Sequence, residues 1–403
     1  MSGELFHPTD FDDAMSEAKK SLSAQSDQQA DDIVRQLAPL REAIDDTDRQ
    51  LLALLNDRAE LVRQVGHVKQ GGRRSPVYVA SRERDLVAAL VQSNPGPFPD
   101  GAIGPVFREI ISATRSLEDQ VRVGYLGPAG TFSHQAALDQ FGSQVVLSPF
   151  THLEDVFQAT ERGETHFGVI PVENTIEGAI NPTYDALMES EVSICGEVMA
   201  AINQHLMSQS GQEEDVRVVA SIPQATGQCR RWLHERMREV EIQNTSSTAA
   251  AAQLASERPE VAAIGSSAAA EVYGLAFVAR NIEDRRGNTT RFAVIGSEAP
   301  KPSGNDLTSA AFTVRRDQAG ALYHLLEPFA RHGVNLTAVQ SRPMKGRPWE
   351  YVFFIDLEGH ESDDSVGAAL DEAAAYAHSH KILGSYPRAV RPGDRAPGER
   401  PTP

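Results

Sequence analysis

The stretch Arg-Arg-Gly-Asn-Thr-Thr-Arg-Phe, residues 285–292, places three arginines around two adjacent threonines. A hydroxyl held beside cations can donate a hydrogen bond to a negatively charged substrate, so this stretch is a candidate anion site. The alternative is a solvated turn that leads into the following strand, because glycine and asparagine are common turn residues. The stretch alone does not separate the two interpretations.

A second group of polar residues follows helical spacing nearer the start of the chain. Arg58 and Lys69 are eleven residues apart, about 20° past three full circles at ~100° per residue, so both point to one side of a helix. The next two helical segments contribute Arg82, Glu83, Thr114 and Glu118. Each alone is more ordinary as a solvated side chain. Together they indicate cations that line an apolar helical interior, as a small dianion requires.

Hydroxyl residues form a third group at predicted helix starts. Thr131 and Ser133 follow a strand that ends at Leu126, and residues 244–254 repeat this pattern at another strand–helix junction. Hydroxyls and free N–H groups at a helix N-terminus can bind a carboxylate, although a plain N-cap is the alternative. Two such sites facing one cleft suit a ligand with two carboxylates. The sequence contains neither a glycine-rich dinucleotide fingerprint nor a P-loop.

Three regimes of sequence pattern must position these groups. Residues 32–119 carry only helical periodicity, and residues 120–299 alternate short apolar strands with helices. Residues 305–390 follow the order strand, helix, two strands, helix, strand. The pattern therefore predicts a multidomain chain with an all-helical domain, a two-lobed α/β domain and a small α+β domain. The polar residues 1–31 and the Pro/Gly-rich residues 391–403 are predicted to be disordered tails.

The first long helix has an unusual length for its domain. It is predicted to begin with Pro39 in its first turn and to end before the glycines at 71–72. Its ~31 residues extend about 47 Å and carry an apolar stripe that includes Leu40, Ile44 and Leu51. A domain of ~80 residues is too small to cover both ends of such a rod. We therefore expect the helix to pair with its copy in an intertwined homodimer, alone or within a higher homo-oligomer.

The composition limits the class of protein. With 40% apolar and 23% charged residues among 403, the chain resembles an ordinary globular protein. A net charge of −18 argues against nucleic acid or an anionic membrane as a partner. Cys195 and Cys229 are the two cysteines, which excludes a disulfide framework or a cysteine zinc cluster. Because no apolar run is long enough for a membrane span and no signal segment opens the chain, we expect a cytoplasmic protein.

The helical regime resembles the all-helical type of chorismate mutase. The resemblance is carried by "LREAIDDTDRQLLALLNDRAELVRQVGHVK", "SPVY", "RERDL" and "FREIISATRSLE". It implies an enzyme that rearranges chorismate to prephenate, with Arg41 reaching in from the partner chain. It further implies that the substrate is bound by Arg41, Arg58, Lys69, Arg82, Glu83, Thr114 and Glu118, with Lys69 and Glu118 counted as catalytic.

This rearrangement is pericyclic, so the resemblance implies no nucleophile, metal or cofactor. The protein would hold a compact conformer of the substrate and place cations against the charge that develops on its ether oxygen. Glu118 can donate a hydrogen bond to that oxygen only when it is protonated. We therefore expect mutase activity to fall as the pH rises and Glu118→Gln to flatten the profile. Some members of this family carry an acidic residue where this chain has Val79.

The strand–helix regime resembles prephenate dehydratase over nearly its whole length. The matching motifs, in the family's order, are "GPAGTFS" (127–133), "VIPVENTIEGAI" (169–180), "ICGE" (194–197), "SIPQATGQC" (221–229), "STAAAA" (247–252) and "GNTTRF" (287–292). The resemblance implies a fold like that of periplasmic binding proteins and assigns Thr290 as the catalytic residue. It implies a substrate cleft lined by Thr131, Glu173, Asn174, Thr175, Ser221, Gln228, Thr290 and Arg291.

The dehydratase reaction explains why a threonine could serve. Prephenate loses its ring carboxylate as CO₂ and its ring hydroxyl as water, and the enzyme must assist the departing hydroxyl and hold the carboxylates. A threonine hydroxyl is too weak an acid to give up its proton freely, so we expect Thr290 to act as an oriented hydrogen-bond donor. Arg291 is expected to bind a carboxylate. Whether Glu173 supplies the proton behind Thr290 is open.

The third regime resembles the ACT ligand-binding domain attached to dehydratases, which has a ferredoxin-like fold. "GALYHLL" (320–326) and "SRP" (341–343) match the segments that hold phenylalanine between two chains in that family, although Gln340 stands where glutamate is usual. The resemblance implies effector binding by Gly320, Ala321, Leu322, Ser341, Arg342 and Pro343. It implies that phenylalanine inhibits the dehydratase.

Together these resemblances predict a bifunctional chorismate mutase and prephenate dehydratase of phenylalanine biosynthesis, inhibited by its end product. One alternative is a monofunctional dehydratase whose helical domain serves only in dimerisation. Another is an amino-acid sensor built from a binding cleft and an ACT domain. The intact Thr290–Arg291 pair and the cations of the helical domain favour the bifunctional enzyme.

Overall fold

The computed structural model describes residues 8–70, 78, 80–314, 319–344 and 350–389. The chain divides into two compact units, Met1–His67 and Val68–Pro403. Among the described residues, no helix combines the length and the apolar character needed to cross a membrane.

The first unit is formed by one helix, α1 (Pro8–Gln70), whose last residues belong to the second unit. The predicted end near residue 70 is confirmed, but the predicted start at Pro39 is wrong because the helix begins at Pro8 and contains Pro39. Residues 8–31, expected to be disordered, are helical. They include several alanines and glutamines, contain no glycine and have no proline after the first position, so neither of the two strongest helix breakers interrupts the helix before Pro39.

The apolar stripe of α1 is exposed within this chain. Leu40, Ile44 and Leu51 are 60%, 59% and 55% exposed. A helix gains most of its stability in a protein by burying its apolar face, so this stripe needs a packing partner.

The second unit begins with two short helices, α2 (Ala80–Ser93) and α3 (Asp100–Arg115). Ile103, Ile111 and Thr114 are buried on one side of α3, at the spacing of a helix that packs through a single face. The all-helical character predicted for this part of the chain is confirmed.

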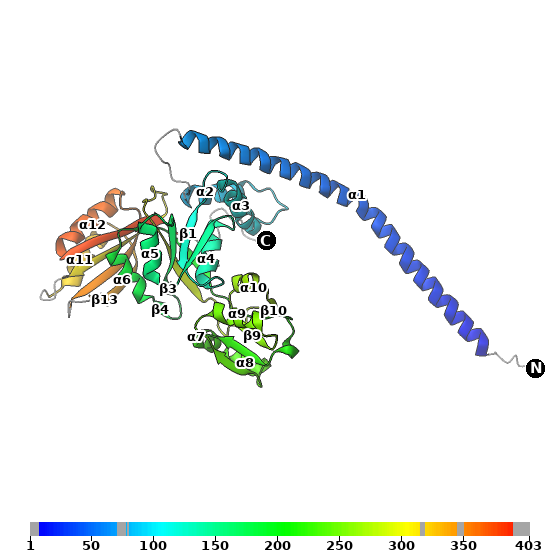
Figure 1. Cartoon of the computed structure of the whole chain (residues 1–403). Coiled ribbons are helices and arrows are strands. Elements are labelled where there is room, and N and C mark those ends of the chain that lie inside the picture. The colour runs from blue at the N-terminus through cyan, green and yellow to red at the C-terminus, as the bar shows by residue number, and fades with distance from the viewer. Residues whose placement is uncertain (1–7, 71–77, 79, 315–318, 345–349, 390–403) are drawn as a thin grey trace, which may run out of the picture. The chain divides into compact units, whose positions relative to one another are not determined.

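A mixed sheet forms the first lobe of the α/β region (Figure 1). Its strand order is β2 (Val146–Phe150), β1 (Arg122–Leu126), β3 (Phe167–Asn174), β11 (Thr289–Gly296) and β5 (Ser193–Ala201), with the short β4 (Gly178–Ala179) paired to β3. The helices that belong to this lobe are α4 (Phe132–Phe141), α5 (Leu153–Glu161) and α6 (Asn181–Glu189). The central strands are apolar and buried along most of their length, as expected for a sheet covered on both faces.

The second lobe is a separate five-stranded sheet. Its order is β10 (Ala276–Ala279), β6 (His205–Ser208), β9 (Val261–Gly265), β7 (Val218–Ser221) and β8 (Glu241–Asn244). Its helical segments are η1 (Glu213–Asp215), α7 (Pro223–Gln228), α8 (Arg230–Arg236), α9 (Thr248–Glu257) and α10 (Ser267–Tyr273). The chain passes between the lobes twice, through residues 202–204 and 280–288, so the predicted two-lobed α/β architecture is confirmed.

The last part of the chain is a four-stranded antiparallel sheet with two helices. Its strand order is β13 (Leu336–Pro343), β14 (Tyr351–Glu358), β12 (Asp306–Val314) and β15 (Ser379–Pro387). With α11 (Ala321–Arg331) and α12 (Asp364–Tyr376), the order matches the predicted βαββαβ pattern. Alternate residues of β12 point to opposite faces, so Phe312 packs against α11 and α12 while Ala311 faces the first lobe.

One hydrophobic core joins the antiparallel sheet to the first lobe. It contains Val172, Ile194 and Ile295 of the lobe together with Phe354 and Leu383 of the antiparallel sheet. β15 approaches β5 so closely that a Cβ added to Gly384, whose φ is +149°, would lie 2.1 Å from the backbone oxygen of Ile194. Only glycine permits this approach. The two sheets therefore pack as one body along this face.

Candidate active sites

A chain of side-chain amides connects Thr290 to the second lobe. Thr290 lies near the start of β11, is 7% exposed, and its Oγ1 accepts a hydrogen bond from Asn174 Nδ2 at 2.8 Å. The same Nδ2 donates to Asn288 Oδ1 at 2.8 Å. Asn288 Nδ2 lies 3.5 Å from Gln228 Oε1, which also accepts from Gln204 Nε2 at 3.1 Å. Three residues predicted from the motifs, Thr290, Asn174 and Gln228, are therefore brought together.

The turn after β3 sets the direction of these hydrogen bonds. Asn174 Oδ1 accepts from the backbone N–H groups of Ile176 and Glu177 at 2.9 and 3.0 Å. A side-chain amide has one oxygen and one NH₂ group, so Asn174 must present its NH₂ to Thr290. The Thr290 oxygen therefore acts as the acceptor, and its own hydrogen is left to donate to a ligand.

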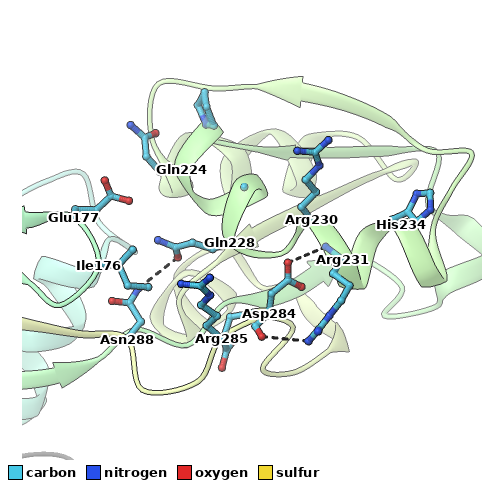
Figure 2. Close-up of a pocket in the computed structure, with 13 residues that line it drawn as sticks. Ile176, Glu177, Gln224, Gln228, Arg230, Arg231, His234, Asp284, Arg285 and Asn288 are labelled. Atoms are coloured by element: carbon cyan, nitrogen blue, oxygen red, sulfur yellow. Dashed lines mark hydrogen bonds between the residues drawn. The ribbon is translucent and has the colours of Figure 1, made fainter.

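A cleft of about 910 Å³ lies beside these amides, where residues of both lobes and of the second crossing meet (Figure 2). Arg230, Arg231 and Arg285 line it, together with Gln228 and Asn288. Thr290 itself is not among the lining residues. Its neighbour two positions earlier, Asn288, forms the wall on that side. Glu177, Glu283 and Asp284 also line the cleft, so its formal charges balance and an anion would be bound by individual arginines.

The three arginines differ in the hydrogen bonds that they form within the protein. The backbone N–H of Arg231 donates to Asp284 Oδ2 at 2.8 Å, and its guanidinium donates to the Asp284 backbone oxygen at 3.3 Å. The side chains of Arg230 and Arg285 are exposed and form no hydrogen bond or ion pair with any residue in the described part of the chain. Arg230 and Arg285 thus have all their side-chain donors available to a ligand, and Arg231 has part of its own.

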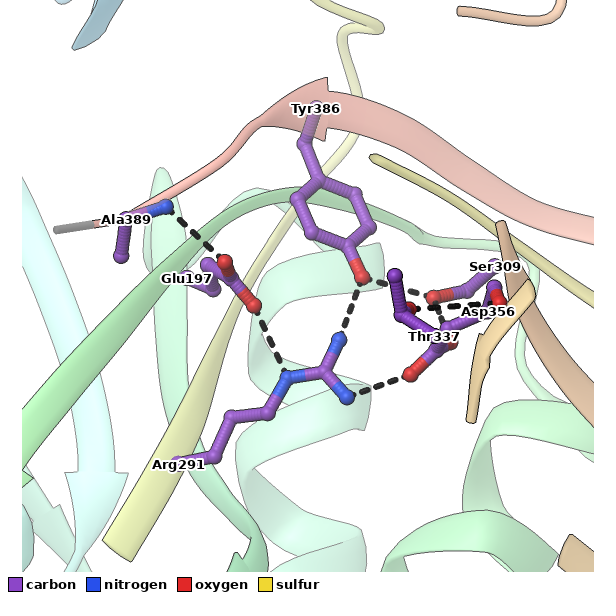
Figure 3. A network of polar contacts seen from close by, with 7 residues as sticks. All are labelled: Glu197, Arg291, Ser309, Thr337, Asp356, Tyr386 and Ala389. Atoms are coloured by element: carbon purple, nitrogen blue, oxygen red, sulfur yellow. Dashed lines mark hydrogen bonds and ion pairs between the residues drawn. The ribbon is translucent and has the colours of Figure 1, made fainter. Parts of the chain in front are cut away.

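Arg291 and Glu173 lie on the other face of the sheet. Successive residues of a strand point to opposite faces, so Arg291 points away from the Thr290 side. Its guanidinium is held in a cluster between β5 and the antiparallel sheet (Figure 3). Glu173, paired with Arg291 across the two strands, lines a separate cavity of about 370 Å³. The prediction that both residues line the cleft with Thr290 is therefore not what the structure shows.

Three other predicted residues occupy local positions. Thr131 is the N-cap of α4 and accepts from a backbone N–H of that helix, which is the plain N-cap alternative. Ser221 is fully buried and donates to the backbone oxygen of Ile264 at 2.8 Å. Thr175 lies beside the amides and donates to Asn288 Oδ1 at 3.4 Å. Of these, Thr175 belongs to the Thr290 cluster.

Residues that sequence reasoning missed complete the cleft. Asn288 lies inside the "GNTTRF" motif, and its position two residues before Thr290 places it on the same face, a signal that strand alternation could have given. Arg230 directly follows the "SIPQATGQC" motif. Gln204 carries no motif, and its Oε1 is buried without a partner among the described residues. Folding alone brings Gln204 to the site.

Two ion pairs define the polar interior beside α2 and α3. Lys69 Nζ lies 2.7 Å from Glu118 Oε1, with the side chains 26% and 10% exposed. Glu83 Oε1 accepts from Arg115 Nη1 at 2.6 Å. Arg115, which sequence reasoning missed, is 5% exposed and also lies over the ring of Tyr78. The structure thus brings together Lys69 and Glu118, as predicted. Glu83 instead forms an ion pair with Arg115, which was not predicted.

The remaining residues predicted for the mutase are distributed over the helices. Thr114 is buried and donates to the backbone oxygen of Ile110 at 2.8 Å, a bond within α3. Arg82 is exposed on α2. Arg41 and Arg58 lie on α1, in the first unit. Val79 lies outside the described residues.

The predicted effector residues lie at two places of the antiparallel sheet. Gly320, at φ +79°, is the N-cap of α11, which begins with Ala321 and Leu322. Ser341 and Pro343 are exposed on β13. Arg342, between them, instead forms an ion pair of 2.7 Å with Asp185 of α6.

Comparison with known proteins matches each part of the chain to a family. Residues 40–119 match chorismate mutase type II, residues 123–300 match prephenate dehydratase, and residues 309–375 match the ACT domain. The bifunctional chorismate mutase/prephenate dehydratase of Aquifex aeolicus is 44% identical over 361 residues, which cover 89% of this chain and 99% of that protein.

Two solved structures are similar to the dehydratase and ACT parts. Prephenate dehydratase from Arthrobacter aurescens, in complex with L-Phe, is 29% identical with a TM-score of 0.62 and covers 70% of this chain and 92% of its own. A protein described as a novel type of quorum quenching acylase is also 29% identical, with a TM-score of 0.61 and coverage of 66% and 98%. A shared fold does not settle the reaction, which depends on the site. The match over 89% of the chain, including the helical domain, shows that the chain is a member of the bifunctional chorismate mutase/prephenate dehydratase family, an enzyme of phenylalanine biosynthesis.

Proposed function

We propose that this chain dehydrates prephenate in the cleft beside Thr290 and rearranges chorismate at a separate site that includes Lys69 and Glu118. The observation that carries the first assignment is the direction of the Asn174–Thr290 hydrogen bond, which leaves the threonine hydrogen for a ligand. The second rests on the partly buried Lys69–Glu118 pair, a cation and an acid side by side in the helical domain.

The chemistry of dehydration needs one donor and at least one cation in defined places. As the ring carboxylate leaves as CO₂, its bonding electrons enter the ring and the hydroxyl at the opposite carbon departs, taking one proton to become water. Thr290 donates the hydrogen bond that stabilises the departing hydroxyl, and the proton that completes the water comes ultimately from solvent. Glu173 lines another cavity, so it is not the proton source for this hydroxyl.

The substrate carboxylates are bound by the cations of the cleft. Arg230 and Arg285 both line it, one from α8 and one from the crossing between the lobes. Charge-assisted hydrogen bonds from arginine to carboxylate are the strongest of their kind and fix orientation as well as affinity. The side-chain oxygen of Gln228 accepts a hydrogen bond from Asn288 (Figure 2). The NH₂ group of Gln228 is therefore a further donor in the cleft. Arg285 is the arginine of the 285–292 stretch that lines this cleft.

The resemblance to chorismate mutase also assigns two arginines of α1 to the substrate. Arg41 and Arg58 are the cations of that helix assigned to chorismate, and Arg41 comes from a second chain. The support for a second chain is the exposed stripe of Leu40, Ile44 and Leu51, which a copy of α1 would cover. The working assembly is therefore a homodimer or a larger homo-oligomer.

Phenylalanine is the proposed effector of the dehydratase. The support is the ACT domain match and the relative from Arthrobacter aurescens, which is described in complex with L-Phe. The effector contacts Gly320, Ala321, Leu322, Ser341 and Pro343, while Arg342 couples β13 to α6. The proposed location is the cytoplasm, in keeping with the two free, buried cysteines.

Purified protein mixed with chorismate tests this assignment. We expect prephenate to appear first and phenylpyruvate to follow, with no metal or cofactor added. Conversion of prephenate but not of chorismate would support the monofunctional dehydratase. Binding of an aromatic amino acid with neither conversion would support the sensor.

A further inference from the structure

Arg291 is held by three partners on the face of β11 opposite Thr290 (Figure 3). Its Nε donates to Glu197 Oε2 of β5 at 2.8 Å, and Nη2 donates to the Tyr386 hydroxyl of β15 at 2.7 Å. Nη1 donates to Asp356 Oδ2 of β14. The three nitrogens of one guanidinium thus reach one strand of the dehydratase lobe and two strands of the ACT sheet.

The cluster is closed on the ACT side by a fourth residue. Ser309 of β12 donates to Asp356 Oδ1 and is hydrogen-bonded to the Tyr386 hydroxyl at 2.6 Å. Tyr386 has no exposed surface, and the side chains of Arg291 and Asp356 are each 14% exposed. Burial alone would lower the pKa of Arg291, but Tyr386, Asp356 and Glu197 raise it well above its usual value, so the guanidinium stays charged.

The charges of this cluster depend on one another. Two carboxylates, Glu197 and Asp356, share one cation, and a change that separates either from Arg291 leaves a buried charge without its partner. Breaking a buried pair in this way is strongly destabilising. Movement of β14 or β15 must therefore pull Arg291 with it.

Arg291 is joined to Thr290 by a single peptide bond. Their Cα atoms are about 3.8 Å apart in any trans peptide, so a shift of one residue displaces the other. The pairing of β11 with β3 also changes register directly after Arg291, between Arg291 and Phe292. Such irregularities bend a strand and redirect its side chains. A displacement of about 1 Å of a catalytic group can cost about 100-fold in rate.

We propose that Arg291 is a positioning residue that carries the state of the ACT domain to Thr290. The effector segment on β13 pairs with β14, the strand of Asp356, and Ala338 of β13 lies directly opposite Asp356. An effector that moves β13 and β14 therefore reaches the Arg291 cluster through one strand pair. This role rests on the proposed function, in which Thr290 acts on prephenate and phenylalanine is the effector.

Arg291→Lys separates this role from direct binding of the substrate. Lysine keeps the charge but loses the planar fork that reaches three partners. A positioning role predicts that the kcat of the dehydratase falls while the KM for prephenate stays nearly unchanged, because Arg291 points away from the cleft. A carboxylate-binding role, as predicted from the sequence, requires the KM to rise instead. Mutase activity of the same protein reports whether the chain is folded.

The ACT side of the cluster is tested by Tyr386→Phe and Asp356→Asn. Tyr376→Phe, at an exposed tyrosine of α12, is the matched control. For each protein, calorimetry gives the Kd for phenylalanine, and dehydratase assays give the concentration that halves the rate. We expect the ratio of the second value to the first to rise at least fivefold in both cluster variants, within the range of about 5- to 150-fold typical of allosteric coupling. The control should keep the ratio of the unmodified protein.

These experiments test separately whether the Arg291 cluster couples the ACT domain to Thr290 and whether phenylalanine is the effector. An unchanged ratio in both variants would overturn the link, as would a rise in the KM of Arg291→Lys without a fall in its kcat. If Asp356→Asn does not fold, Tyr386→Phe decides alone, since it keeps the buried ring. An unmodified protein that binds no phenylalanine would refute the proposed effector, and the kcat and KM of Arg291→Lys, which need no effector, would still decide the positioning role.

Discussion

Replacing Asn174 with aspartate reverses one hydrogen bond and leaves the shape of the site unchanged. The new side chain keeps an oxygen for the backbone N–H groups of Ile176 and Glu177. In place of the NH₂ group that donates to Thr290 at 2.8 Å it has a second oxygen. Thr290 would then donate its only hydrogen to that carboxylate and have none for the departing hydroxyl of prephenate.

The size of the effect follows from the loss of one preorganised donor. Removing such a donor costs about 10²–10³ in kcat in well-studied enzymes, so Asn174→Asp should lower dehydratase kcat by about 100-fold or more. The KM for prephenate should change little, because Arg230 and Arg285 are untouched. A protonated carboxyl can donate again, so the activity relative to the unmodified protein should rise as the pH falls toward about 4.

The assay follows phenylpyruvate formation from prephenate, with mutase activity on chorismate measured in the same samples. Asn181→Asp, the same substitution at an exposed position of the same lobe, is the matched control and should behave as the unmodified protein. A kcat of Asn174→Asp close to the unmodified value would refute the reasoning. So would a loss of activity that does not depend on pH.

Three further substitutions test other parts of the account. Arg285→Ala should raise the KM for prephenate about tenfold, because it removes one charge-assisted hydrogen bond. Arg286→Ala removes an arginine outside the cleft lining and should leave the KM unchanged. Gly384→Ala should destabilise the protein by about 1–3 kcal/mol, seen as a lower unfolding temperature in calorimetry, because its Cβ would meet the backbone oxygen of Ile194. Glu118→Gln should raise mutase activity at neutral and alkaline pH and flatten its pH profile, because an amide donates at any pH. A profile that is flat already in the unmodified protein would contradict this.

The fold could be predicted from the sequence where the patterns are local. Apolar periodicity and turn residues separated the helical, α/β and α+β regimes, and all three are confirmed. The predicted start of α1 at Pro39 is wrong, because a proline marks a helix start only when the segment before it cannot be helical. The core shared by the first lobe and the ACT sheet could not be predicted, because it joins strands that are far apart in the chain.

The candidate dehydratase site was predictable only in part. Thr290, Asn174 and Gln228 lie in recognisable motifs and meet in the structure. Arg291 was misplaced although period-two alternation already puts it on the face opposite Thr290. Gln204 could not be found, since it has no motif and reaches the cluster only when the chain crosses between the lobes.

The most direct test of the central claim is the fate of chorismate in Thr290→Ala. We expect this variant to convert chorismate to prephenate at the rate of the unmodified protein and then to stop, so that prephenate accumulates and phenylpyruvate does not form. Chromatography of the reaction over time measures both products from one sample. Phenylpyruvate formed at the unmodified rate would contradict the assignment of Thr290, and loss of prephenate formation as well would contradict the separation of the two sites.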